Sequence, residues 1–325
     1  MPSTPPSTFR PRNILLFGAT GNIGKFILDA IVNARDEFSR VAIFTSPASA
    51  QSKAALFDDL KTNKRVEVIT GDITNEKDVT EAYKGIDTVI SALGRTVIEP
   101  QIPLIRLADQ ASDVKWFLPS EYGTDINYSP ASASEKPHQG KLKVRAYLEN
   151  ETKDLAYTYV VTGPYPEMYI KGFPMGREAG GWDAKGKKAT LLGEKGQDPV
   201  SFTTMKDVGT LVLATLRRPS VSFNRALKVN SFTTTPAGIQ AEFEKQTGGQ
   251  SWTDVQYTSL PRLRELEQQA WAEGSPAAAG WTLRRIWTEG GTLYEKTDND
   301  VIGNPKLTTL EELVKEIVSS QGAKL

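Results

Sequence analysis

The chain of 325 residues contains no cysteine and a single histidine, His138. Without thiols there can be no disulfide framework, thiolate nucleophile, zinc ribbon or cysteine-ligated iron–sulfur cluster. One histidine excludes a multi-histidine metal site and leaves one imidazole as a possible base. We therefore expect no metal cofactor.

The sequence also lacks an excess of charge of either sign and any long apolar run. The 39 Lys and Arg residues balance 39 Asp and Glu residues, which disfavours a nucleic-acid partner because no broad basic surface is available. No run approaches the roughly 18 apolar residues typical of a membrane span. We expect a small-molecule substrate as partner, with no nucleic acid and no membrane. The oligomeric state cannot be predicted from these patterns.

The two ends of the chain carry little hydrophobic pattern. Residues 1–12 are rich in Pro, Ser and Thr, so they predict a disordered tail and not a secretory signal, which needs an apolar segment. The last residues, Ala323-Lys324-Leu325, resemble the peroxisomal address Ser-Lys-Leu, and a frayed end is the equally plain alternative. These features predict an intracellular protein, cytoplasmic or peroxisomal.

Short apolar runs alternate with helical patterns through residue 162. This alternation predicts βαβ units and an α/β fold, a Rossmann-like doubly wound parallel sheet over residues 13–162. The predicted strands cover 13–17, 40–44, 66–70, 87–91, 114–118 and 157–161, and the predicted helices cover 22–34, 51–61, 75–83, 102–111 and 141–150.

The pattern changes after residue 162, where Gly, Pro and aromatic residues become frequent. We expect residues 163–325 to form mainly a smaller substrate-binding lobe, with elements that can return to the sheet. This part predicts a hairpin or loop over 182–197, a linker at 277–280 and helices over 207–216, 236–246, 261–272 and 309–319.

Three glycines lie between the first predicted strand and the first predicted helix, in the run Gly18-Ala-Thr-Gly21-Asn-Ile-Gly24. Gly18 permits a tight turn, Gly21 permits a pyrophosphate to approach the backbone, and Gly24 permits close packing of the helix. The helix N-terminus supplies free N–H groups for phosphate. The motif therefore predicts a dinucleotide site.

The residues after the second strand indicate which dinucleotide binds. An NAD site usually has an acidic residue there, for the ribose 2′-hydroxyl, whereas this chain has Thr45-Ser46-Pro47. Lys53 follows as a cation suited to a 2′-phosphate, unless it is a solvated lysine on a helix surface. The pattern favours NADP(H).

The usual proton donor of short-chain dehydrogenases is absent, because no tyrosine has a lysine four residues later. A G-x-S-x-G hydrolase motif is absent too. Lys141 stands at the start of the helix that follows the fifth strand, where a helix N-terminus disfavours an ammonium ion. Lys143 is an equal candidate on these grounds alone.

Several motifs together resemble the NmrA-like branch of atypical short-chain dehydrogenases. Within that branch, the chain is most similar to the isoflavone, pinoresinol–lariciresinol and phenylcoumaran benzylic ether reductases. The motifs are the glycine turn, Val-Ile-Ser-Ala-Leu-Gly94, Gln101, Val-Lys-Trp-Phe-Leu-Pro-Ser-Glu-Tyr-Gly123, Lys141-x-Lys-Val-Arg145, Tyr157-Thr-Tyr-Val160 and Phe202-Thr-Thr-Met-Lys-Asp-Val-Gly209.

The resemblance implies that Lys141 is the catalytic lysine. The candidates for contact with substrate are Tyr122, His138, Tyr165 and Tyr169; His138 lies three residues before Lys141 and could assist it, unless it is a solvated loop residue. Because Thr162-Gly-Pro-Tyr-Pro166 departs from the family pattern, phenylpropanoid substrates do not carry over. Cofactor contacts are implied at Gly18, Thr20, Gly21, Asn22, Ile23, Gly24, Ser46, Lys53, Ala92, Leu93, Gly94, Gln101, Ser120, Glu121, Tyr122, Lys141 and Arg145.

We therefore expect an NADPH-dependent reductase of an aromatic or alkaloid-like metabolite, with the proton handled by Lys141. Two alternatives remain open at this point. One is an NADP-binding regulator without turnover. The other is an enzyme that holds NADP(H) and directs a cyclisation or isomerisation.

Overall fold

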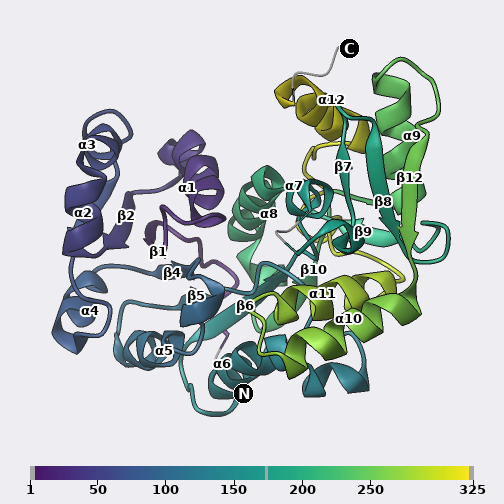
Figure 1. Ribbon diagram of the computed structural model, residues 1–325. Helices are drawn as coiled ribbons and strands as arrows, with labels where there is room; N and C mark the ends of the chain where they lie inside the picture. Colours follow the sequence, from purple (N-terminus) through teal and green to yellow (C-terminus); the bar gives the residue numbers. More distant parts are fainter. Residues whose placement is uncertain (1–3, 173–174, 322–325) are drawn as a thin grey trace.

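The computed structural model describes residues 4–172 and 175–321. Its centre is a parallel seven-stranded sheet with the order β10-β6-β5-β4-β1-β2-β3 (Figure 1). This order confirms the predicted Rossmann-like sheet, and the reversal beside β1 creates a crevice at the carboxyl ends of the strands. The strands are β1 (Asn13–Phe17), β2 (Arg40–Thr45), β3 (Glu67–Thr70), β4 (Thr88–Ser91), β5 (Trp116–Leu118), β6 (Ala156–Val161) and β10 (Arg225–Lys228).

Helices cover both faces of this sheet, with α1 and α8 on one face and α4, α5 and α6 on the other (Figure 1). Both faces of β1 are buried, because successive side chains of a strand point to opposite sides. Ile14 and Leu16 belong to one core cluster, whereas Leu15 and Phe17 belong to the other. The helices of this part are α1 (Gly24–Asn33), α2 (Pro47–Ser52), α3 (Ala54–Thr62), α4 (Glu76–Ala82), α5 (Gln101–Gln110), α6 (Gln139–Asn150) and α8 (Met205–Arg217).

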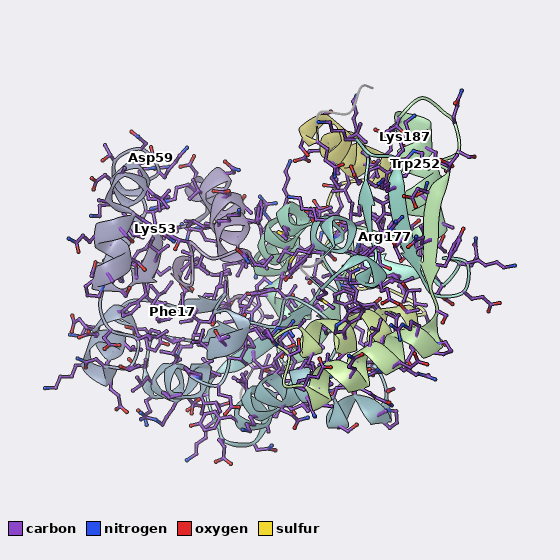
Figure 2. All side chains as sticks on the ribbon, viewed as in Figure 1. Phe17, Lys53, Asp59, Arg177, Lys187 and Trp252 are labelled. Atoms are coloured by element: carbon purple, nitrogen blue, oxygen red, sulfur yellow. The ribbon has the colours of Figure 1, made fainter. Side chains whose placement is uncertain are left out.

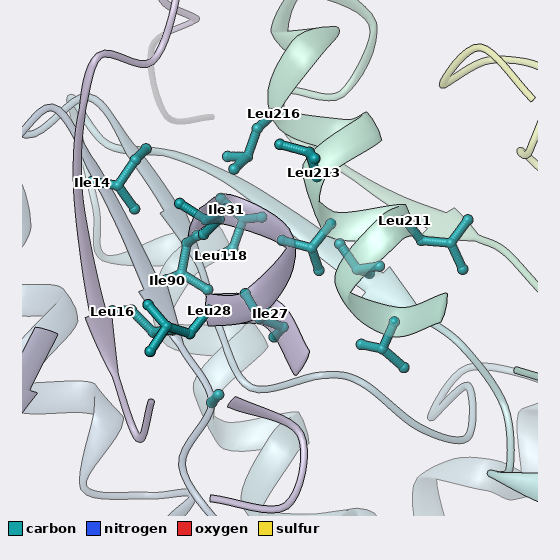
Figure 3. Close-up of a cluster of buried hydrophobic side chains, with 14 of the residues drawn as sticks. Ile14, Leu16, Ile27, Leu28, Ile31, Ile90, Leu118, Leu211, Leu213 and Leu216 are labelled. Atoms are coloured by element: carbon teal, nitrogen blue, oxygen red, sulfur yellow. The ribbon is translucent and has the colours of Figure 1, made fainter. Parts of the chain in front are cut away.

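Two elements of the sheet layer come from beyond residue 162. Strand β10 pairs with β6 in parallel, and α8 packs directly against α1. Figure 3 shows their shared core, in which Leu211 and Leu216 of α8 join Ile27 and Ile31 of α1. The backbones approach closely because α8 has a glycine at position 209.

The rest of the chain builds a second core around two small sheets. One has the order β12-β8-β7, and its antiparallel β7–β8 pair is the hairpin predicted within 182–197. The elements are α7 (Pro166–Lys171), β7 (Gly181–Asp183), β8 (Lys188–Leu192), β9 (Val200–Phe202), β11 (Phe232–Thr234), α9 (Pro236–Gln246), β12 (Asp254–Thr258), α10 (Leu260–Ala272), α11 (Ala278–Thr288) and α12 (Leu310–Ser320).

The predicted linker at 277–280 is wrong, because Ala278 to Gly280 form the first turn of α11. Alanine favours helix, and Trp281 and Ile286 bury the helix against the second core. Glycine is less favourable than alanine in a helix, but at position 280 it makes room for Met175. A Cβ there would lie 2.7 Å from the Met175 sulfur.

The helix predicted over 51–61 is two helices, α2 and α3, which meet at Lys53. Helix α2 begins earlier than expected because Ser46 caps it, accepting from Ser49 N at 3.2 Å, and Pro47 is its first residue. Both are strong helix-start signals.

Residues 4–12, expected to be disordered, lie against the sheet layer instead. The ring of Phe9 is 6.5 Å from that of Trp116 and 5.8 Å from that of Phe223, between ring centres. The tripeptide at 323–325 lies outside the described residues. Within the described part of the chain, no helix is long and apolar enough to cross a membrane.

Candidate active site

The glycine turn between β1 and α1 has the backbone shape that only glycine permits. Gly18 has φ +74°, and a Cβ there would lie 2.5 Å from the carbonyl oxygen of Ala92. A Cβ on Gly24 would lie 2.0 Å from the carbonyl oxygen of Gly18. No side chain caps the N-terminus of α1. Because the amides of Lys25 and Phe26 donate to the carbonyls of Gly21 and Ile23, an anion would bind to the amides that precede Lys25.

A cavity of about 570 Å³ opens beside this turn. It lies between the turn, the end of β2 and the loop after β3, at the carboxyl edge of the sheet. The sequence patterns did not indicate Phe57, Asp72 and Ile73 in its lining, although Asp72 directly follows the third predicted strand and its turn glycine. The lining comprises Phe17, Gly18, Ala19, Thr20, Ile43, Phe44, Thr45, Ser46, Pro47, Ala48, Ser49, Phe57, Gly71, Asp72, Ile73 and Leu93.

Lys53 lies at the junction of α2 and α3 (Figure 2). Its Nζ atom donates to the Thr20 hydroxyl at 2.8 Å. Ser46, at the start of α2, lines the same cavity. The structure thus brings the Lys53 cation and the hydroxyl groups of Thr20 and Ser46 to this cavity. The residues that follow β2 there include no carboxylate.

Lys141 lies in the first turn of α6, at the opposite end of the crevice from Lys53. Its Nζ atom donates to the backbone carbonyl of Glu121 and is 3.6 Å from the point that a Cβ of Gly123 would occupy. Burial lowers the pKa of Lys141 to about 8, with Arg95 and Arg145 acting in the same direction and Glu121 opposing them. A lysine with such a pKa can exchange a proton near neutrality.

Lys143, the alternative candidate, points elsewhere. Its ammonium pairs with Glu99 at 3.0 Å, and 59% of its side chain is exposed. The geometry therefore favours Lys141.

Glu121 and Arg145, both expected to touch the cofactor, bind each other instead. Two bonds of 3.1 and 2.8 Å join them, and their side chains are 1% and 5% exposed. The guanidinium also stacks on the Tyr159 ring at 4.4 Å. The two charges neutralise each other, so this ion pair fixes the 119–123 loop on α6. Neither side chain has a free charge to offer a cofactor.

Gln101 is likewise buried beneath the site. Its amide donates to Ile98 O at 3.0 Å and accepts from Ser120 N at 2.8 Å. The Ser120 hydroxyl in turn donates to Leu93 O at 2.8 Å. Gln101 therefore orders the loops that follow β4 and β5, and its expected contact with the cofactor stays a prediction.

Tyr165 lies next to Lys141. Its hydroxyl donates to the carbonyl of Tyr122, and Lys141 uses the preceding carbonyl, that of Glu121. Tyr122 is buried in the core on the α1 side of the sheet, and its hydroxyl has no hydrogen-bond partner among the described residues. Burial raises the pKa of both phenols.

The other two residues expected to contact substrate are inside the protein. Tyr169 is 1% exposed in the second core, with the Arg284 guanidinium 4.4 Å from its ring. His138 is 2% exposed, and its Nδ1 lies 3.0 Å from Ser132 O. Neither side chain has much surface to offer a ligand, so the structure does not bring them to the site as expected.

The second lobe holds the loop before α6 through contacts that the sequence patterns did not indicate. Arg285 of α11 binds Glu135 at 2.7 Å, and Trp287 Nε1 donates to the Thr124 hydroxyl at 2.7 Å. Pairings of this kind join residues more than 140 positions apart, so no local pattern could reveal them.

The fold and these contacts define a Rossmann protein with a dinucleotide crevice and a lysine of lowered pKa at its far end. The chain belongs to the NmrA-like family, whose model matches residues 11–273. The predicted family resemblance is therefore confirmed.

Individual relatives agree with this assignment. The chain is 30% identical to the oxidoreductase aprR of Aspergillus flavus over 309 residues, 94% of this chain and 97% of the relative. It is 29% identical to phenylcoumaran benzylic ether reductase PT1 of Pinus taeda over 207 residues, 63% of this chain and 65% of the relative. The protein is an oxidoreductase of this family.

Solved structures share the fold. An isoflavone reductase matches with a TM-score of 0.77 at 23% identity, over 95% of this chain and all of that chain. A leucoanthocyanidin reductase–NADPH complex from Vitis vinifera matches with a TM-score of 0.77 at 21% identity, over 94% of this chain and 99% of that chain.

Proposed function

We propose that the protein is an NADPH-dependent reductase of an aromatic or alkaloid-like small metabolite, in which Lys141 handles the proton. The observation that carries this proposal is the position of Lys141, bound to Glu121 O beside Tyr165 at the carboxyl edge of the sheet. The named reductases among the relatives act on isoflavone, phenylcoumaran and leucoanthocyanidin compounds, all of them aromatic.

The residues present fit a nicotinamide dinucleotide phosphate. The uncapped N-terminus of α1 suits a pyrophosphate. Gly18 and Gly24 permit the tight turn before it, because a Cβ at either position would collide with backbone atoms. Lys53 and Ser46 suit a 2′-phosphate at the end of β2. A Vitis vinifera neighbour is a complex with NADPH. When bound, this cofactor supplies the hydride.

The chain's own residues supply orientation and a proton. The buried Arg145–Glu121 pair fixes the carbonyl that holds Lys141. Below about pH 8 the Lys141 ammonium carries a proton and can donate it to a substrate oxygen as negative charge develops there. The reverse reaction needs the neutral amine as a base.

The test is to replace Lys141 by alanine, with Lys143→Ala as the matched control on the same helix. Wild-type protein and NADPH would be incubated with a panel of aromatic ketones, enones and benzylic ethers, and products would be identified by mass spectrometry. We expect Lys141→Ala to lower kcat/KM by about 100- to 10,000-fold, the usual contribution of a general acid. NADPH affinity, measured by fluorescence, should stay unchanged.

Undiminished turnover in Lys141→Ala would contradict the assignment. Conversion of a substrate without net NADPH consumption would instead support the cyclisation or isomerisation alternative. NADPH binding with no turnover of any compound would support the regulator alternative.

A further inference from the structure

The loop that follows β5 folds closely around the Lys141 ammonium. The carbonyl of Glu121 accepts a hydrogen bond from Lys141 Nζ, and the same atom lies 3.6 Å from the point that a Cβ of Gly123 would occupy. Because Gly123 has no side chain, its backbone can lie this near to the ammonium. The course of residues 121–124 therefore determines how much water reaches Lys141.

Residues 121–123 are held by the sheet layer and by α6. The Glu121 carboxylate binds Arg145 at 2.8 Å. The carbonyl of Gly123 accepts from the amide of Gly163, just after β6, at 2.9 Å. The next residue, Thr124, is held from the second lobe instead.

Trp287 of α11 makes that contact. Its Nε1 atom donates to the Thr124 hydroxyl at 2.7 Å, and both side chains are 7% exposed. The indole ring itself packs in the second core, 6.1 Å from the Tyr169 ring between ring centres. The second lobe thus fixes the place of the indole N–H, and a buried donor of this kind is costly to leave without a partner.

Helix α11 meets the chain between β5 and α6 at a second place, but farther from the lysine. Arg285 binds Glu135 at 2.7 Å, close to the start of α6. Only the bond from Trp287 meets the residue next to Gly123. Trp287 is therefore the side chain of α11 whose loss would shift the backbone beside the ammonium.

We propose that Trp287 is a positioning residue for the reaction at Lys141: through Thr124 it holds Gly123 against the ammonium and limits the access of water to it. This inference rests on the proposed function and adds a part of the second lobe to the proton-transfer site.

The effect on Lys141 can be separated from a change of charge. The charged and titratable side chains that interact electrostatically with Lys141 are those of Arg95, Glu121, Asp125, His138 and Arg145. Burial is nevertheless the largest cause of the lowered pKa of Lys141. Trp287 and Thr124 carry no charge, so breaking their bond acts through burial alone, and better hydration of the ammonium raises the pKa of Lys141.

The experiment follows acylation of Lys141 in the full chain from pH 6 to 10, by peptide mass spectrometry. Dividing the rate at pH 7 by the rate at pH 10 removes differences in reagent access and leaves the fraction of neutral amine. We expect this ratio to fall about three- to tenfold in Trp287→Phe, which keeps an aromatic ring but loses the N–H. Thr124→Val should lower the ratio as well, and Thr124→Ser, which keeps the hydroxyl, should restore it.

Trp252→Phe is the matched control. Trp252 also donates from Nε1 to a buried threonine, Thr247, at 3.0 Å. It packs on α9 of the second lobe, where its ring is 5.7 Å from that of Phe243 (Figure 2). We expect Trp252→Phe to lower the melting temperature about as much as Trp287→Phe and to leave the acylation ratio of Lys141 unchanged.

An unchanged ratio in Trp287→Phe and Thr124→Val contradicts the inference, and so does an equal fall in Trp252→Phe, which would reflect general loosening of the lobe. If Trp287→Phe does not fold, the smaller change Thr124→Val decides alone. The double variant Trp287→Phe/Thr124→Val should be no worse than the worse single variant, because the two share one bond. Additive losses would show that Trp287 does not act through Thr124.

This measurement uses neither substrate nor cofactor. If Lys141→Ala kept full turnover, the proposed function would fail while the acylation ratio still tested the role of Trp287. If the ratio did not respond to Trp287→Phe, the positioning role would fail while Lys141 could still be the proton donor.

Discussion

The Lys141 ammonium is largely removed from water and donates a hydrogen bond to one backbone carbonyl, that of Glu121. Because burial lowers its pKa to about 8 from the usual 10.5, its charge changes within the range where activity can be measured. In the direction of reduction the ammonium is the active form. We therefore expect kcat/KM for reduction to be level below pH 8 and to fall about tenfold per pH unit above it.

The oxidation direction should show the opposite limb, rising towards pH 8 and then levelling, because it needs the neutral amine. Rates in both directions between pH 6 and 10 would check this prediction. Lys143→Ala should leave both profiles unchanged, since Lys143 pairs with Glu99 away from the site. A reduction profile that stays level to pH 10 would exclude Lys141 as the acid.

We expect Lys53 to determine a different property, the choice between NADPH and NADH. Its ammonium is held over the glycine turn by Thr20, where a 2′-phosphate would meet it. Hydrogen bonds to charged groups contribute about 1.5–3 kcal/mol, so Lys53→Ala should weaken NADPH binding about 10- to 100-fold and leave NADH nearly unchanged. Fluorescence titration of both cofactors measures the ratio.

Lys61→Ala on α3 is the control for this ratio, because Lys61 is exposed and lies outside the cavity lining. If Lys53→Ala kept the preference for NADPH, another group would have to bind the 2′-phosphate.

At the scale of elements, the contact between α1 and α8 depends on a glycine. A Cβ on Gly209 would lie 2.1 Å from the carbonyl oxygen of Phe26 and 2.7 Å from its carbon, both backbone atoms that cannot rotate away. Gly209→Ala must push the two helices apart, and overpacking of this kind costs about 1–3 kcal/mol. Urea unfolding should show this loss of stability.

Gly140→Ala provides a control of opposite sign. A Cβ at Gly140 would make ordinary contact with Ile98 at 3.4 Å, and alanine in a helix is about 0.5–1 kcal/mol more favourable than glycine. If Gly209→Ala were as stable as the wild type, the close packing of α8 on α1 would be disproved.

The elements also show what local patterns can predict. The apolar run Asn13–Phe17 is a strand buried on both faces, and its bounds in the structure agree with the prediction. The short strands β9, β11 and β12 were missed because they have three to five residues and depend on partners far along the chain. Ala278 to Gly280 were misread because small residues suit both linkers and helices.

The same limit applies to the site. The proximity of Lys53 to the glycine turn, seen in its bond to Thr20, could be predicted because both follow strands of the parallel sheet; their roles toward the cofactor stay predictions. The choice between Lys141 and Lys143 could not be predicted, because the two lysines lie on the same helix and differ only in their neighbours in the folded protein. Arg145 and Glu121 were expected at the cofactor because they belong to a family motif. A sequence motif does not reveal that the two charged side chains pair with each other.

At the scale of the whole molecule, the sheet layer cannot be completed by the first half of the chain. Strand β10 covers the edge of β6 along Thr158–Val161, and α8 covers the apolar side of α1. The second lobe also fixes the loop before α6 through Arg285 and Glu135. The sheet layer and the second lobe therefore depend on each other for their order.

This dependence predicts that residues 1–162 alone do not form a stable Rossmann domain. The fragment would expose the backbone of β6 as an unpaired edge, together with the face of α1 that Leu211 and Leu216 cover in the intact chain. We expect it to lack a cooperative thermal transition and to bind NADPH at least about tenfold more weakly than the full chain, because mobile glycine-turn residues bind less tightly. Circular dichroism and fluorescence titration, with the full chain as reference, measure both properties. A fragment that unfolds cooperatively and binds NADPH with full affinity would show instead that residues 13–162 are an independent domain.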